Sequence, residues 1–355
     1  MRIMNDEYVN RELAEVYDKM QNVMRLKEVA HITAGYYSMN SSSFALTDCP
    51  YQRGRIIEGF SETLQQYVSV EGDAVRPILT PSMVKAFDFA DYQRYNKCLI
   101  TADHKASDFA SRYPLTAGYL QKCYEYTFGG MILWRDAIIN PSLREAMDKK
   151  KVIISTLGNV SHAMLDAEAH VISTVSTYLC SFPREDFQTY KAYIAIFNSK
   201  LFSYMLYHEM SNRTSSNNTR IGVLENMLIP QYSDGYRILE SMADCMLSLS
   251  DPDMRQLTAR ISNDRIGYYL LKALDMVVYE MYMPEYMREK GLDVIAHMDK
   301  APFMSRSYDM ESRILETYQW FQRSDNVVRQ KIWLLDTRSP ELLYRIQTFN
   351  PNEQD

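Results

Sequence analysis

The pattern of apolar residues changes near residue 235, and this change limits the folds that the chain can adopt. Before it, short apolar runs rich in β-branched residues are separated by polar turns, which is typical of strands. After it, apolar residues recur at helical spacing and the strand pattern disappears. The sequence therefore predicts an α/β protein of the α+β type, in which a curved, mixed sheet is followed by a helical C-terminal region.

Individual elements follow from the same periodicities. Strands are predicted at residues 29–32, 66–70, 98–100, 152–155, 171–179 and 227–230. Helices are predicted at residues 114–127, 141–149, 188–210, 236–249, 253–262, 309–322 and 325–335. Asp264 is expected to cap a further long helix, which Pro284 ends or follows as the first residue of the next. The apolar face of that helix is formed by Ile266, Leu270, Leu274, Val277 and Met281.

The beginning of the chain reads as an amphipathic helix over residues 5–25, with Asn5 or Asp6 as its cap. Its apolar seam consists of Val9, Leu13, Val16, Met20 and Val23. Such a seam packs either on the chain's own core or on a partner helix. We therefore expect three parts: an N-terminal helix at 1–25, a recognition domain at 26–235 and a helical region at 236–355.

Charge and cysteine content restrict the class of protein. The net charge of −6 argues against a protein that coats nucleic acid through overall positive charge, but not against one whose basic residues gather on one face. The five cysteines are scattered and never form Cys-x-x-Cys, so buried free thiols are expected. No apolar run reaches the ~18 residues of a membrane helix, and the first residues lack the apolar core of a signal peptide. A cytoplasmic location without membrane contact is expected.

Motifs for common chemistries are missing. The chain contains no Gly-x-Gly, no Gly-Lys-[Ser/Thr], no [Asn/Asp]-Pro-Pro-Tyr, no Glu-x-Lys and no Gly-x-Ser-x-Gly. The best metal candidate is the set His162, Asp166, Glu168 and His170, but its position before a strand favours a hairpin turn. We therefore expect no metal, no cofactor and no catalytic site in this chain.

Several short segments together resemble one family. Residues 26–35 (LKEVAHITAG) and 76–85 (RPILTPSMVK) are similar to two opening motifs of restriction–modification specificity domains. Further similar segments follow in the same order: 95–100, 113–120, 151–154, 165–166, 197–201, 220–221, 228–230 and 278–282. The series resembles the TaqI-like C-terminal specificity domain, which is the target-recognition half of type II adenine methyltransferases and is related to type I specificity subunits. Pro81 or its neighbours replace a turn glycine of the family pattern.

The resemblance implies a function and partners. It implies a non-catalytic module that recognises double-stranded DNA in a restriction–modification or phage-defence system. Because the methyltransferase half is absent from this sequence, a partner subunit would supply adenine-N6 methylation or cleavage and would hold S-adenosylmethionine. The alternative is a relative with another role: a protein-interaction or structural subunit that no longer binds DNA. A third reading is a hydrolase whose active site matches no known motif, but no residue pattern in the sequence favours it.

Basic and amide side chains are the candidates for DNA contact, because Lys and Arg bind phosphates while Arg, Asn and Gln read base edges. The first group surrounds Gly54, which would allow close approach of the backbone to a phosphate. The second follows the proline motif, and the third lies in a polar loop. The candidates are Arg53 and Arg55; Arg76, Lys85, Arg94 and Lys97; and Asn212, Arg213, Asn217, Asn218 and Arg220. Each group also fits a simpler role: a surface turn, structural support by Arg76, or a solvated loop.

Overall fold

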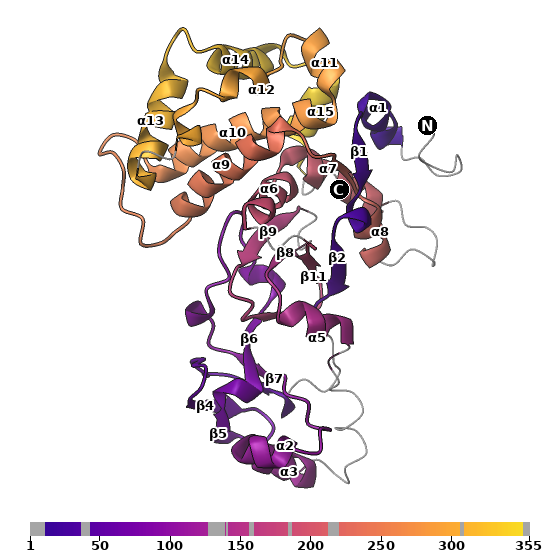
Figure 1. Ribbon diagram of the computed structural model, residues 1–355, viewed down its shortest axis with the longest axis vertical. Coiled ribbons are helices and arrows are strands. Elements are labelled where there is room, and N and C mark those ends of the chain that lie inside the picture. Colours follow the sequence, from indigo (N-terminus) through magenta and orange to yellow (C-terminus); the bar gives the residue numbers. More distant parts are fainter. Residues whose placement is uncertain are drawn as a thin grey trace.

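The computed structural model describes residues 11–36, 43–126, 139, 141–155, 160–183, 187–211, 220–305 and 309–350. Figure 1 shows an elongated molecule, with a helical region at one end, a central sheet in the middle and a smaller β-rich part at the other end. The predicted α+β class is confirmed. No helix among the described residues is long and apolar enough to cross a membrane.

The central sheet has the strand order β2-β11-β8-β9, and each neighbouring pair is antiparallel. Its strands are β2 (His31–Ala34), β8 (Lys151–Ser155), β9 (His162–Asp166) and β11 (Thr177–Ser181). Alternate residues of one strand belong to different cores: Val152 and Ile154 face one, and Ile153 faces the other. Because both faces are covered, these strands read as continuous apolar runs rather than alternating ones.

The smaller β-rich part, at the bottom of Figure 1, is called the lower part. It contains a mixed sheet with the order β10-β6-β7-β3. In it β10 is parallel to β6, while the other two pairs are antiparallel. A separate hairpin is formed by β4 and β5, and α3 packs against β5. The bounds are β3 (Ala45–Leu46), β4 (Ile56–Ser61), β5 (Gln66–Glu71), η3 (Gly72–Ala74), β6 (Val75–Leu79), η4 (Pro81–Met83), η5 (Tyr92–Arg94), β7 (Cys98–Ile100), α2 (Phe109–Arg112), α3 (Pro114–Tyr126), α5 (Pro141–Met147) and β10 (Ile172–Ser173).

The helical region packs directly on the helices that cover the central sheet, as α6 contacts α9 and α7 contacts α10 and α15. One hydrophobic core therefore runs from Leu13 of α1 to Ile346 of α15. The predicted domain division at residue 235 stays a prediction. The bounds are α1 (Arg11–Lys19), β1 (Val23–Arg25), η1 (Leu26–Glu28), α6 (Phe187–Phe197), α7 (Lys200–Ser211), α8 (Arg220–Asn226), β12 (Leu228–Pro230), α9 (Asp234–Leu249), α10 (Asn263–Tyr282), α11 (Pro284–Glu289), α12 (Ile295–Met298), η7 (Pro302–Met304), α13 (Met310–Gln322), α14 (Val327–Arg338) and α15 (Glu341–Thr348).

The predicted N-terminal helix is too long at its C-terminal end. It stops at Lys19, Asn22 adopts a left-handed φ of 50°, and residues 23–25 form β1 paired with β12. Its seam residues Leu13 and Val16 are fully buried, so this helix packs on the chain's own core. The proposed caps Asn5 and Asp6, and Val9, lie outside the described residues.

The single strand predicted at 171–179 is wrong, because two sheets share this segment. β10 pairs with β6 in the lower sheet, whereas β11 pairs with β2 and β8 in the central sheet. Between them Ser176 adopts a φ of 69°, and the Thr177 N–H donates to the Thr174 carbonyl at 3.3 Å. Residues 174–176 are therefore one of the points where the chain crosses from one sheet to the other.

Two helix predictions also need correction. The helix expected at 188–210 divides into α6 and α7 at Asn198, whose side-chain amide bonds both backbone groups of Ala163 in β9, at 2.8 and 2.9 Å. Residues 253–262 are not helical. Ser262, rather than Asp264, caps α10 by accepting the Arg265 N–H. Pro284 starts α11, and the five residues predicted for the apolar face of α10 are buried.

Asp275 on α10 gives the fold a predictable pH dependence. Burial raises the pKa of its carboxyl from 3.8 to about 7, although the Lys200 N–H donates to it at 2.8 Å and opposes the rise. Since the folded pKa exceeds the unfolded one, Asp275 stabilises the fold fully below pH 4, and this contribution is lost as the pH rises through 7. We expect wild-type protein to lose more stability between pH 5 and 8 than Asp275→Asn, as measured by urea unfolding. Equal losses in both proteins would contradict this assignment.

Candidate nucleic-acid interface

The first predicted pair, Arg53 and Arg55, lies in the turn that leads into β4, and both residues are exposed. Gly54 between them has a φ of 71°, and its N–H donates to the Asp73 carboxylate at 3.1 Å. A Cβ on Gly54 would meet no atom within 4 Å, so the glycine serves the left-handed turn rather than avoiding a clash. The turn thus presents one arginine on each side of Gly54, and a hydrogen bond to Asp73 holds its backbone.

An aromatic cluster lies beside this turn, where the lower sheet meets the central sheet. The ring of Tyr92 meets His170 edge-on at 5.1 Å and Tyr51 at 5.5 Å. Burial raises the pKa of Tyr51, and the charges of Arg76 and Arg53 oppose the rise. Burial has the opposite effect on the imidazole of His170, because the charged form is the protonated one, and it lowers the pKa of that side chain. We call Tyr51, Arg53, Arg76, Tyr92 and His170 the waist cluster.

The second predicted group divides into paired and exposed residues. Arg76 forms an ion pair with Asp148 at 2.9 Å. Arg94 pairs with Asp88 at 3.2 Å and with Asp91 at 3.4 Å. These two arginines support the fold through carboxylates. By contrast, Lys85 and Lys97 are exposed on the segments after β6 and before β7.

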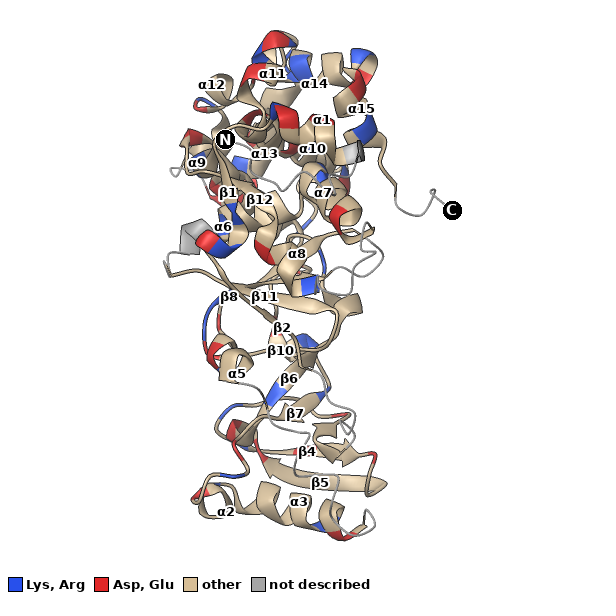
Figure 2. Ribbon diagram, turned by 90° about the vertical axis from the view of Figure 1, so that its right-hand side faces the viewer, with Lys and Arg blue, Asp and Glu red and all other residues tan. Residues whose placement is uncertain are grey.

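The third predicted group can be placed only in part. Arg220 is exposed at the first position of α8, a helix that packs against η1 and β2. Asn212, Arg213, Asn217 and Asn218 lie outside the described residues. Figure 2 shows acidic and basic residues interspersed over the helical region, with further basic segments beside β6 and between α5 and β8.

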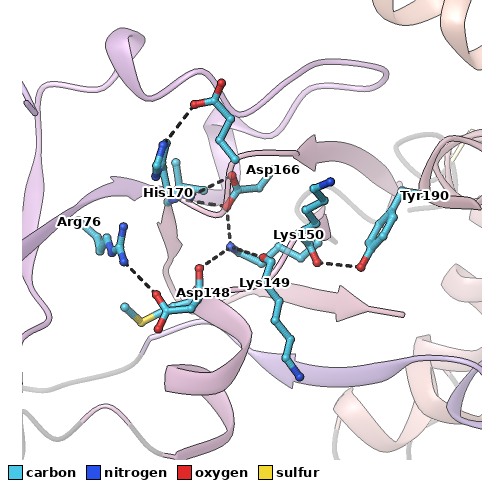
Figure 3. A network of polar contacts seen from close by, with 11 residues as sticks. Arg76, Asp148, Lys149, Lys150, Asp166, His170 and Tyr190 are labelled. Atoms are coloured by element: carbon cyan, nitrogen blue, oxygen red, sulfur yellow. Dashed lines mark hydrogen bonds and ion pairs between the residues drawn. The ribbon is translucent and has the colours of Figure 1, made fainter. Parts of the chain in front are cut away.

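A fully buried ion pair underlies the waist cluster (Figure 3). The Nζ of Lys151 lies 2.5 Å from the Asp166 carboxylate, and both side chains have no exposed surface. Lys151 also donates to the Met147 and Lys149 carbonyls, at 3.1 and 3.3 Å. Burial lowers the pKa of Lys151, and the charge of Asp166 opposes that shift. The pair thus ties β8 and β9 to the end of α5.

The carboxylate of Asp166 also shapes the turn that carries His170. It accepts the N–H groups of His170 and Val171, at 3.2 and 3.3 Å. Nε2 of His170 lies 3.2 Å from Glu168. Asp166 thus ends β9 and His170 lies in the turn that follows, but this turn is not the predicted hairpin, because β9 and β10 belong to different sheets. In the described part of the chain, no group of three or more His, Cys, Asp or Glu residues is arranged to hold a metal ion.

Sequence reasoning missed this ion pair and the aromatic cluster. Lys151 and Asp166 are direct cross-strand partners, but their register becomes known only when β8 and β9 are paired. Tyr51, Tyr92 and His170 come from three distant segments. The expectation of buried free thiols is confirmed, because all five cysteines are buried and none of them forms a disulfide bond.

A polar cleft of about 320 Å³ adjoins the waist cluster between η3, the segment after β7, α2 and α5. Three arginines and four aspartates line it, including Arg76, Arg112, Arg144, Asp73 and Asp148. Arg144 donates to the Thr101 carbonyl at 3.2 Å. Since the two charge signs nearly balance, the cleft does not favour an anion or a cation.

No protein-family model and no curated protein matches the sequence. Among solved structures, the chain is similar to the Type IIL restriction-modification enzyme MmeI in complex with DNA, with a TM-score of 0.41 and 11% sequence identity. The match covers 84% of this chain and 36% of that chain, so the similarity spans only about a third of the enzyme's length.

Removing one partner of the buried pair should strongly destabilise the protein. Asp166→Asn leaves the Lys151 ammonium without a countercharge, and we expect a loss of about 3–5 kcal/mol in urea unfolding. In Lys151→Met/Asp166→Asn the amide oxygen can still accept one of the two turn N–H groups and no unpaired buried charge remains. The double variant should therefore lose less than the sum of the two single variants. The exposed pair Lys149–Glu145 (2.6 Å) provides the control, since Lys149→Met/Glu145→Gln should cost under about 1 kcal/mol. Strict additivity at 151 and 166 would refute the coupling.

Proposed function

We propose that the chain recognises double-stranded DNA as the target-recognition module of a restriction–modification or phage-defence system. In this proposal it is non-catalytic by itself and acts with a separate adenine-N6 methyltransferase or nuclease. The observation that carries the proposal is that the segments resembling specificity domains contact one another in the fold, although they are dispersed from residue 26 to residue 282.

Direct contacts between these segments support a common scaffold. The Leu26 N–H donates to the Met227 carbonyl at 2.9 Å, and the Tyr282 hydroxyl donates to the Leu228 carbonyl at 2.8 Å. The amide of Asn198 clamps Ala163 in β9, the strand that also contains Leu165 and Asp166. Segments that meet in this way hold a framework together, and they leave the turns between them free to carry recognition residues.

The placement of exposed cations is consistent with phosphate contact near the waist cluster. Arg53 and Arg55 stand at one turn, and Lys85 and Lys97 both lie in the segment that connects β6 to β7. Such residues fix the position of a protein on the duplex, whereas side chains that enter a groove read sequence. The partly exposed Tyr92 and His170 pack on Tyr51, two residues before Arg53, and are suited to groove or sugar contacts.

The alternative of an interaction subunit also has a specific observation in its favour. Trp333 on α14 and Tyr268 on α10 are 65% and 55% exposed. Large exposed aromatic residues are enriched in protein–protein interfaces. DNA binding by the isolated chain separates the two proposals.

Binding of the full chain to a pool of random duplexes should weaken steeply as salt increases. Each lost phosphate contact reduces the slope of log K against log salt by about 0.9. We expect Arg53→Ala/Arg55→Ala and Lys85→Ala/Lys97→Ala each to reduce that slope by about two units, in fluorescence anisotropy titrations from low to physiological salt.

The matched control is Arg288→Ala/Arg338→Ala, which removes two exposed arginines of the helical region. Its slope should equal that of the wild type. Selection of bound sequences from the pool should yield a consensus if the chain reads bases. Failure of the wild type to bind any duplex, even at low salt, would rule out the proposed function and favour the interaction subunit.

A further inference from the structure

A second hollow, of about 200 Å³, lies in the helical region at the corner between α12, α13 and α14. We call it the corner cleft. Two valines at the start of α14 form part of its wall. The polar and aromatic lining residues are His297, Lys300, Trp320, Arg323, Asp325 and Asn326. They come from the end of α12, the last turn of α13 and the short connection to α14.

The corner is held rigidly by hydrogen bonds that do not use its cations. The side-chain amide of Asn326 donates to the Trp320 carbonyl at 3.0 Å and accepts the Arg329 N–H at 3.0 Å. Arg329 donates in turn to the Gln322 carbonyl at 2.5 Å. Asn326 is buried, so the backbone at Trp320 and the start of α14 are fixed relative to each other.

The cations of the corner cleft differ from other cations nearby. In the helical region Lys272 pairs with Asp336 and Lys331 pairs with Asp293, at 2.5 and 2.9 Å. Among the described residues, the structure gives Lys300 and Arg323 no ion pair, although Asp325 lines the same cleft. The cleft therefore combines two cations, one carboxylate and an imidazole with a half-buried indole.

We propose that the corner cleft binds the phosphate of a nucleotide, with the base against Trp320. Lys and Arg form charge-assisted hydrogen bonds to phosphate oxygens, and the indole offers an aromatic surface on which any base can stack. A free nucleotide and a nucleotide of a nucleic-acid strand share this chemistry. The inference goes beyond the proposed function, because it concerns the helical region and not the waist cluster.

Isothermal titration of the full chain with dAMP, inorganic phosphate and a duplex tests the inference. Lys300→Gln/Arg323→Gln should weaken the binding of both dAMP and phosphate at least about tenfold. Trp320→Leu should weaken dAMP and leave phosphate unchanged, because only the base stacks. Both cations are exposed, so their substitution leaves the packing intact; circular dichroism checks the fold of Trp320→Leu.

The probes also distinguish the two sources of the phosphate. Binding of dAMP that depends on the cleft identifies a free nucleotide as an occupant. If only the duplex binds, and Lys300→Gln/Arg323→Gln lowers its salt slope by about two units, the occupant is a nucleic-acid strand. Arg288→Gln/Arg338→Gln should change neither result. The inference fails if the wild type binds dAMP and phosphate no better than the cleft variants do and the duplex slope is also unchanged. Loss of dAMP binding in Arg53→Ala/Arg55→Ala would likewise place the nucleotide elsewhere.

Discussion

The buried ion pair between Lys151 and Asp166 is the interaction on which the middle of the molecule depends. Two charges without exposed surface are tolerated because every strong bonding group finds a partner: Lys151 bonds two carbonyls, and Asp166 accepts two backbone N–H groups. The pair closes one end of the β8–β9 ladder and shapes the turn that places His170 against Tyr92. A charge pair inside the scaffold thus determines how the waist cluster is presented at its surface.

The central sheet separates two hydrophobic cores, and this explains the elongated shape. One face packs on the lower β-rich part through residues such as Ile153 and Leu179, and the other packs on α6 and the helical region. The crossing at residues 174–176 joins the lower sheet to the central sheet covalently, and the bridge between Tyr36 and Thr174 adds a backbone link at the same place.

The sequence predicted individual elements better than their division among sheets. The helix α10 was predictable because five apolar residues follow a 3.6-residue period and a proline stands after it. The split between β10 and β11 was not, since an apolar, β-branched run looks the same whether it serves one sheet or two. The candidate lysines and arginines could be chosen from the sequence by residue type alone. Whether an arginine is free or paired depends on a distant carboxylate, as Asp148 shows for Arg76.

This distinction between paired and exposed cations limits how the chain could achieve specificity. Arg76 and Arg94 already have carboxylate partners, so breaking those pairs would offset part of any gain from DNA contact. Near the waist cluster, nonspecific attraction then depends mainly on Arg53, Arg55, Lys85 and Lys97, in a protein whose net charge is −6. A few phosphate contacts give weak sequence-independent binding. Under the proposed function, tight binding would therefore require complementary base contacts or a partner subunit, and such a requirement would favour the target over the rest of the DNA.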